Sequence, residues 1–217
     1  MPDLYFKCNT KDVCYTKAMK VICGLDEAGR GALAGPLVLA SVLLPEGFSF
    51  NSLDKNVVVR DSKTLSLRQR PKAFEEINNY SLKTDIEIIT SNEINEKGIQ
   101  WANTEGFTRL ILRNEADSYI VDGRLKLTRL GRKEKTTRSE IDADATIPSV
   151  SAAGIVAKVT HDEMMFKLHH KFLHYGWNTN VGYGTKEHIN ALKKFGKCIY
   201  HRNLFIKTAL RNYGQIS

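Results

Sequence analysis

The chain of 217 residues lacks the features that mark exported and membrane proteins. No stretch approaches the about 18 consecutive apolar residues that a membrane-spanning helix needs, and the N-terminus lacks the charged and then apolar pattern of a signal peptide. The four cysteines include no C-x-x-C pair, which argues against a structural zinc site. We therefore expect a cytoplasmic protein with reduced thiols and no membrane association.

Internal repeats, low-complexity segments and long linkers are absent as well, so the length suits one domain with a substantial core. We expect residues 1–19 to be an N-terminal extension and residues 20–217 to be that domain, including its C-terminal helices. Positive charge is in excess, because 32 Lys and Arg against 24 Asp and Glu give a formal net charge of +8. This excess favours a polyanionic partner, nucleic acid before a membrane surface, although a basic, solvated surface would give the same count.

Apolar periodicity and helix-capping residues predict strands first, then alternating helices and strands, then helices. The loop after the first strand is too short for a crossover helix, so the first two strands should be antiparallel neighbours. This order indicates an α/β fold, with a mixed sheet flanked by helices and a helical C-terminal part. The expected strands are residues 20–25, 37–44, a part of 81–90, 119–121 and 141–144. The expected helices are residues 67–79, 101–115, 149–174, 186–195 and 204–211, with Ser66, Ser91 and Thr185 as N-caps.

Carboxylates stand at the ends of several predicted strands. Asp26 and Glu27 close the first strand, Asp122 closes a later one, and either Asp142 or Asp144 ends the next. Neighbouring strands bring their ends to a common crevice, so these side chains should meet there. Oxygen donors without nearby His or Cys suit Mg²⁺ or Mn²⁺, and two such ions about 3.5–4 Å apart support phosphodiester cleavage. The alternative is that each Asp is an ordinary turn or cap residue.

The tripeptide Gly29-Arg30-Gly31 directly follows the carboxylate pair. Its glycines either permit a tight turn or expose backbone amides that hydrogen-bond a sugar hydroxyl or a phosphate. The 2′-hydroxyl is the group that distinguishes RNA from DNA. Tyr183, which lies between two glycines, is either a surface aromatic or a stacking platform for a nucleotide.

With these residues assembled, the sequence closely resembles ribonuclease HII of the bacterial type over residues 20–205. The resemblance rests on an ordered set of motifs: Asp26–Gly31 with Gly35-Pro36, Asp61–Ser66, Val121–Gly123, Asp144–Asp162, and Gly182–Thr185 followed by His188. The resemblance implies an RNase H-like mixed sheet with flanking helices. It also implies an endonuclease that hydrolyses RNA in RNA–DNA hybrids and incises 5′ of single ribonucleotides in duplex DNA, leaving 3′-hydroxyl and 5′-phosphate ends.

The resemblance also assigns roles to individual residues. Asp26, Glu27, Asp122 and Asp144 are similar to the acidic set that binds Mg²⁺ or Mn²⁺, with two ions when substrate is bound. Asp144 is separated from Asp142 because the family has its Asp four residues before the Pro that opens the helix. The resemblance further implies a 2′-hydroxyl sensor formed by Gly29, Arg30, Gly31 and Tyr183, and phosphate contacts by Lys63 and Lys158.

Three positions depart from the family pattern. Gly154 replaces a usual Ser, His161 replaces a usual Arg, and Asn203-Leu204 interrupts the usual ending after His201-Arg202. None of these removes an expected metal ligand, and we expect a monomer that acts on nucleic acid. The alternatives are a catalytically weak nucleic-acid-binding protein and a branched-DNA nuclease on the same fold.

The most basic segment, residues 124–140, is expected to form a hairpin or flexible loop. It contains the seven cationic residues Arg124, Lys126, Arg129, Arg132, Lys133, Lys135 and Arg138. We expect it either to contact the backbone of a duplex or to be a solvated loop.

Overall fold

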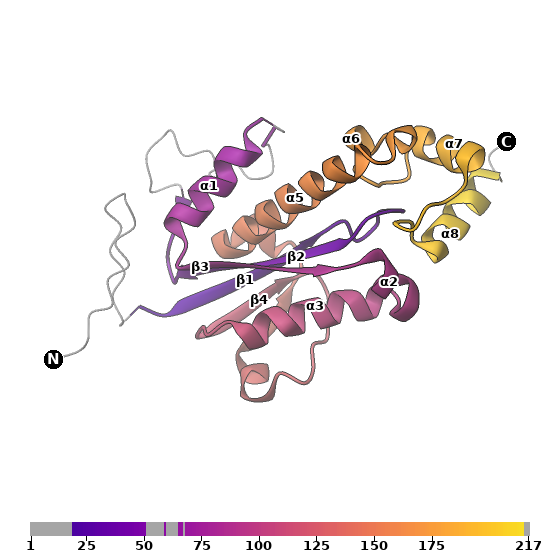
Figure 1. The fold of residues 1–217 in the computed structure, drawn as a ribbon. Coiled ribbons are helices and arrows are strands. Elements are labelled where there is room, and N and C mark those ends of the chain that lie inside the picture. Colours follow the sequence, from indigo (N-terminus) through magenta and orange to yellow (C-terminus); the bar gives the residue numbers. More distant parts are fainter. Residues whose placement is uncertain (1–18, 51–58, 60–64, 67, 215–217) are drawn as a thin grey trace.

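A mixed five-stranded sheet with the strand order β3-β2-β1-β4-β5 forms the centre of the computed structural model (Figure 1). The structure describes residues 19–50, 59, 65–66 and 68–214. The strands are β1 (Val21–Ala28), β2 (Leu37–Pro45), β3 (Lys83–Ile89), β4 (Ser118–Asp122) and β5 (Thr137–Glu140). β1 and β2 are antiparallel, as expected, and so are β2 and β3, whereas β4 runs parallel to both β1 and β5.

Helices cover both faces of this sheet (Figure 1). On one face, α1 (Arg70–Tyr80) and α5 (Pro148–His169) pack with alternate residues of β2 in one apolar cluster. On the other face, α2 (Ser91–Lys97) and α3 (Ile99–Arg113) pack against the remaining residues of β2 and against β1 and β4. β2 is therefore buried along its whole length, which explains why its sequence is a continuous apolar run.

The contact between α5 and β1 is unusually close because both elements carry a glycine at the crossing. A Cβ on Gly24 of β1 would collide with the backbone of Ser149 and Val150 in the first turn of α5. Three small residues in the first half of α5, Ala152, Ala153 and Ala157, are wholly buried against the sheet. The sequence prediction of close backbone packing by this helix is confirmed.

The C-terminal part is a small helical unit at one end of the sheet (Figure 1). It contains η4 (Leu173–Tyr175), α6 (Trp177–Asn180), α7 (Lys186–Phe195) and α8 (Asn203–Gly214). Its apolar cluster is centred on the wholly buried Trp177 and includes Leu33 and Ala34 from the loop between β1 and β2. None of the described helices is long and apolar enough to cross a membrane.

Several boundaries differ from the sequence prediction. β1 continues through Asp26 and Glu27 to Ala28, so the carboxylates lie within the strand instead of after it. The N-cap of α2 is Thr90, which forms a capping box with Glu93, and not Ser91.

Two helices also have bounds that differ from those expected. Ser66 does not cap α1, because that helix begins at Arg70 after the N-cap Gln69. α5 ends at His169 and not at residue 174, because the next residues turn into η4. Thr185 caps α7 as expected, through a hydrogen bond from the His188 amide.

The basic segment is neither a hairpin nor a flexible loop along its whole length. It contains the 3₁₀ helix η3 (Gly131–Thr136) and then β5, and residues 143–146 form the short helix α4 (Ala143–Thr146) where a strand was expected. Lys133 is buried, and its ammonium donates to the carbonyl oxygens of Ile111 (3.2 Å) and Asn114 (2.7 Å) at the end of α3. Lys133 therefore stabilises the C-terminal end of a helix, and it is not available to a ligand.

Two histidines link the elements of the C-terminal unit in a network that requires both rings to be neutral. The Trp177 indole donates to His188 Nε2 (3.1 Å), and His188 Nδ1 lies 2.9 Å from the Tyr183 carbonyl oxygen, to which it donates. His188 Nε2 therefore accepts from His201 Nε2 (3.1 Å), whose Nδ1 accepts from the Cys198 amide (3.0 Å). A proton added at His188 Nε2 would meet the Trp177 indole N–H, and one added at His201 Nδ1 would meet the Cys198 amide N–H.

This network predicts a loss of stability in mild acid. Burial, with the nearby His188 ring, lowers the pKa of His201 from 6.5 to about 4. Between about pH 6.5 and about pH 4, His201 is protonated in the unfolded chain but neutral in the folded chain. The free energy of unfolding therefore decreases as the pH falls through this range. We expect thermal unfolding between pH 7 and pH 5 to show a decrease in Tm that is smaller, by roughly 5 °C, in His201→Gln.

The exposed His170 provides the matched control. His170→Gln should retain the full wild-type decrease in Tm between the two pH values. Equal decreases in the wild type and in His201→Gln would show that the buried network does not govern the acid sensitivity.

Candidate active site

Asp26 and Glu27 lie on opposite faces of β1 because side chains alternate along a strand. Asp26 shares the α5 face with Gly24 and Ala28, and a Cβ on Gly154 of α5 would collide with Asp26 Oδ2. Glu27 lies on the other face, where Arg30 Nη1 approaches its Oε1 at 3.4 Å. The two neighbouring carboxylates are thus held apart by the strand that carries both.

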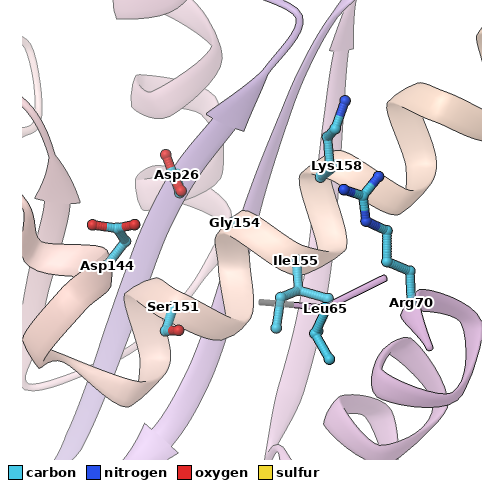
Figure 2. A pocket seen from close by; sticks show the side chains of 8 residues that line it. All are labelled: Asp26, Leu65, Arg70, Asp144, Ser151, Gly154, Ile155 and Lys158. Carbon is cyan, nitrogen blue, oxygen red and sulfur yellow. The ribbon is translucent and has the colours of Figure 1, made fainter. Parts of the chain in front are cut away.

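The α5 face brings Asp122 and Asp144 to Asp26. Asp122 ends β4, which pairs with β1 in parallel so that Leu25 lies opposite Val121 and the two aspartates follow side by side. Asp122 Oδ1 accepts a hydrogen bond from the Ala143 amide (2.9 Å) at the start of α4. This bond fixes α4 against β4, and Asp144 on α4 then borders the same pocket as Asp26 (Figure 2).

The carboxylates destabilise one another's charged forms. Burial, together with the charges of Glu27, Asp122 and Asp144, raises the pKa of Asp26 to about 8. Burial also raises the pKa of Glu27, with Asp122 adding to this rise and Arg30 opposing it. None of the described Lys or Arg side chains forms an ion pair with Asp26. A cation placed between these groups would relieve their repulsion.

The donor set fits hard divalent ions. All four side chains offer carboxylate oxygens, which are the ligands that Mg²⁺ and Mn²⁺ prefer. Within the described part of the chain, no three Asp, Glu, His or Cys side chains converge closely enough to enclose an ion by themselves. Asp26 and Asp144 instead border an open pocket of about 200 Å³, which leaves room for an ion to share its coordination sphere with water and a substrate phosphate.

The same pocket carries positive charge on its opposite side (Figure 2). Lys158 on α5 and Arg70 at the start of α1 both bind Asp162, with Nζ–Oδ1 and Nη1–Oδ2 distances of 2.7 and 2.8 Å. Gly154 and Ser151 lie between this cationic pair and the acidic side of the pocket. The arrangement places cationic side chains beside carboxylates across one turn of α5.

The glycine-rich loop meets Tyr183, as the resemblance implied. The amides of Leu33 and Ala34 both donate to the Gly182 carbonyl oxygen, at 2.8 and 3.3 Å. A Cβ on Gly31 would lie 3.8 Å from Tyr183 Cε1. Burial raises the pKa of the Tyr183 hydroxyl, and the neighbouring backbone of Gly29 partly opposes this rise. The Tyr183 ring is 36% exposed and thus reachable by a ligand that also contacts the loop.

The remaining predicted residues lie elsewhere. Lys63 falls outside the described residues, together with most of its motif. Asp142, the alternative to Asp144, is exposed and adopts a left-handed backbone conformation (φ 54°) before α4. His161 is wholly buried, with its Nδ1 3.2 Å from Asp162 Oδ1 and its ring edge-on to Tyr183. His161 therefore lies under the glycine-rich loop and not at the pocket surface.

Two residues of the site were not selected from the sequence. Asp162 stands four residues after Lys158, a spacing that permits an ion pair on one helix face and could have identified it. Arg70 gave no such signal, because its ion pair with Asp162 spans 92 positions of the sequence. Only the packing of α1 beside α5 brings these two residues together.

Comparison with known proteins identifies a family. The family model described as Ribonuclease HII matches residues 23–208. A protein named ribonuclease HII from Pelagibacter ubique is 42% identical over 86% of this chain and 96% of its own length. Another from Aliarcobacter butzleri is 40% identical over 88% of this chain and 94% of its own.

Solved structures agree with these sequence relatives. Ribonuclease H2 from Pyrococcus horikoshii is similar with a TM-score of 0.70 and 25% identity, over 90% of this chain and 99% of that one. RNase HII from Archaeoglobus fulgidus, solved in complex with PCNA, is similar with a TM-score of 0.70 and 28% identity, over 84% of this chain and 93% of that one. The RNase H-like fold expected from the sequence is thereby confirmed.

The contact of Gly154 with Asp26 generates a prediction. Gly154→Ala should displace the Asp26 carboxylate, because the new methyl group would collide with Oδ2. We expect the affinity for Mn²⁺, measured by titration calorimetry, to fall by roughly tenfold. The helix itself should not be weakened, because alanine favours helices more than glycine does.

Leu192→Ala on α7 is the control for this prediction. Gly106→Ala is unsuitable, because its methyl group would collide with Leu39, which lies opposite Glu27 in the β1–β2 register. Leu192→Ala disturbs only the apolar cluster of the C-terminal unit, which contains none of the four carboxylates. This variant should keep the wild-type affinity for Mn²⁺. An unchanged affinity in Gly154→Ala would show that the position of Asp26 does not determine ion binding.

Proposed function

The chain belongs to the ribonuclease HII family and is a divalent-metal-dependent endonuclease of the ribonuclease H class, and we propose that Asp26, Glu27, Asp122 and Asp144 are its metal ligands. The observation that carries this proposal is that Asp26 and Asp144 border one pocket, with Asp122 on β4 in register beside Asp26 on β1. Glu27 follows Asp26 on the other face of β1 and is included because of the resemblance. The mutual repulsion of these carboxylates and the burial of Asp26 supply the driving force for binding a cation.

The substrate is nucleic acid, and the enzyme hydrolyses the RNA strand of RNA–DNA hybrids. We propose two ions, Mg²⁺ or Mn²⁺, in the presence of substrate. A structure of Bst-RNase HIII in complex with Mn²⁺ is similar with a TM-score of 0.65 over 91% of this chain and 71% of that one, and at 19% identity it supports the fold alone. When bound, such ions activate water and stabilise the leaving oxygen.

The protein's own residues would orient the substrate around that centre. Lys158 and Arg70, held by Asp162, would bind backbone phosphates beside the carboxylates. The backbone of Gly29-Arg30-Gly31 and the exposed ring of Tyr183 would contact the ribose and its 2′-hydroxyl. This arrangement makes cleavage depend on one ribonucleotide, because its sugar must fit between the loop and the ring. A monomer and a cytoplasmic location stay predictions.

The same residues argue against the two alternative functions, a catalytically weak nucleic-acid-binding protein and a branched-DNA nuclease. A catalytically weak nucleic-acid-binding protein would have no need of three neighbouring aspartates whose charges raise the pKa of Asp26. A branched-DNA nuclease would have no need of Tyr183 beside a glycine-rich loop.

Cleavage of a DNA duplex that contains a single ribonucleotide tests this function. With Mg²⁺ or Mn²⁺, we expect the wild type to incise on the 5′ side of the ribonucleotide. Asp122→Asn should reduce the cleavage rate by roughly a hundredfold or more, because it removes one carboxylate charge from the site. Binding of the duplex, measured without cleavage in Ca²⁺, should remain close to that of the wild type.

Asp142→Asn provides the control for the assignment of the metal ligands. Asp142 is a nearby but exposed carboxylate in a left-handed conformation that asparagine also adopts. This variant should cleave at the wild-type rate. Normal turnover by Asp122→Asn, or incision of branched DNA in place of the ribonucleotide duplex, would contradict the proposal.

The basic segment divides into two parts with different positions relative to the site. Arg124 and Lys126 are exposed just after Asp122, at the end of β4 that carries the carboxylates. Arg132 and Lys135 belong to η3, which precedes β5 and therefore lies at the opposite end of the parallel pair β4–β5. Only the first pair is placed to contact a duplex that occupies the site.

Neutralising each pair separately tests this division. Arg124→Gln with Lys126→Gln should lower the salt dependence of duplex binding by about one to two phosphate contacts. Arg132→Gln with Lys135→Gln removes the same charge at the other end and should leave the slope unchanged. Equal slopes for both double variants would show that the basic segment acts only through net charge.

A further inference from the structure

The guanidinium of Arg202 donates all its hydrogen bonds among the described residues to the loop that carries Gly29-Arg30-Gly31. Arg202 is wholly buried, at 0% exposure, just before α8. Its Nε donates to the Gly35 carbonyl oxygen (3.0 Å), Nη1 to that of Arg30 (3.0 Å) and Nη2 to that of Pro36 (2.8 Å). A single side chain therefore ties the middle residue of the glycine-rich tripeptide to the two residues just before β2.

A buried guanidinium without a carboxylate is costly, and no described Asp or Glu forms an ion pair with Arg202. Burial lowers the pKa of Arg202 to about 10, so the group remains charged at neutral pH. The charged guanidinium of Arg202 lies where three backbone carbonyl oxygens need hydrogen-bond donors at the same time. No other side chain offers a planar fork of donors in this geometry, and lysine presents a single point of charge.

The backbone on either side of Arg202 joins the same loop. The Arg202 amide donates to the Leu33 carbonyl oxygen (2.8 Å), and the Gly35 amide donates to that of Tyr200 (2.9 Å). Ala34 and His201 form an antiparallel bridge between these two bonds. Residues 200–202 thus lie along residues 33–35 as a short added strand.

The opposite side of this loop segment contacts the element that carries Tyr183. The amides of Leu33 and Ala34 donate to Gly182, the residue before Tyr183. The segment 33–35 is therefore held between Arg202 on one side and the Tyr183 turn on the other. The distance between the glycine-rich loop and the Tyr183 ring depends on both attachments.

We propose that Arg202 is a positioning residue that sets the discrimination for a 2′-hydroxyl by fixing the carbonyl groups of Arg30, Gly35 and Pro36. The proposal rests on the sensing role proposed for the loop and Tyr183. Arg202 itself does not touch substrate, because its side chain is completely covered by the protein. Its loss should affect the fit of the ribose more than the affinity for the duplex.

Arg202→Lys and Arg202→Ala test the proposal. The measured quantity is the ratio of kcat/KM for a duplex with one ribonucleotide to that for the same duplex with one 2′-deoxy-2′-fluoro nucleotide. We expect Arg202→Lys to reduce this ratio by roughly tenfold, through kcat on the ribonucleotide substrate with little change in KM. Guanidinium ions at millimolar concentration should restore part of the ratio in Arg202→Ala but not in Arg202→Lys, whose ammonium occupies the space.

Tyr175→Phe is the control for a general loss of stability. It removes the hydrogen bond from the Tyr175 hydroxyl to the Gly196 carbonyl oxygen (2.9 Å) in the same helical unit, without touching the loop. We expect a lower Tm and an unchanged ratio. Arg202→Lys with a wild-type ratio, or with an equal loss on both substrates, would overturn the positioning role while leaving the sensing role intact. A wild-type ratio near one would overturn the sensing role, and the positioning role with it.

Discussion

The close crossing of α5 over β1 is the constraint on which the active site depends. Gly24 admits the backbone of Ser149 and Val150, and about one turn later Gly154 leaves room for the Asp26 carboxylate. The helix therefore partly buries Asp26, which still borders an open pocket, while β4 and α4 place Asp122 and Asp144 nearby. Burial and repulsion then raise the pKa of Asp26 to about 8. Without a cation, the protonated form of this carboxyl is therefore favoured at neutral pH. The close packing of α5 on β1 thus both stabilises the sheet and creates the charge repulsion around Asp26 that a cation would relieve.

Sequence reasoning captured this architecture where local patterns are strong. The continuous apolar run at residues 37–44 and the short loop before it were sufficient to predict two antiparallel strands, and the small residues after Pro148 predicted a helix packed closely on the sheet. The predicted end of β1 at residue 25 was wrong, because two adjacent charged residues usually mark the end of a buried strand. The strand continues through them since each carboxylate leaves the sheet on its own face.

The parts that sequence reasoning missed are those fixed by tertiary contacts. Lys133 lies in a segment that is basic throughout, and only the packing of η3 against the end of α3 distinguishes it from its exposed neighbours. Arg70 and Arg202 each bind groups far away in the sequence, across 92 and as many as 172 positions. Motif spacing is uninformative over such separations, whereas the acidic set was found because each of its members ends or follows a strand that local periodicity could identify.

Asp162 accounts for the coexistence of opposite charges within one pocket. Without a partner of their own, Lys158 and Arg70 would be drawn toward Asp26 and Asp144 and would neutralise the ligands that an ion requires. Asp162 binds both cations from the far side, at 2.7 and 2.8 Å, and its own pKa is lowered by the neighbouring His161 and Lys158 despite burial that acts in the opposite direction. The cations are therefore held on the opposite side of the pocket from the carboxylates. Burial lowers the pKa of His161, so its ring stays neutral at neutral pH and does not compete as a cation with Lys158 and Arg70 for Asp162.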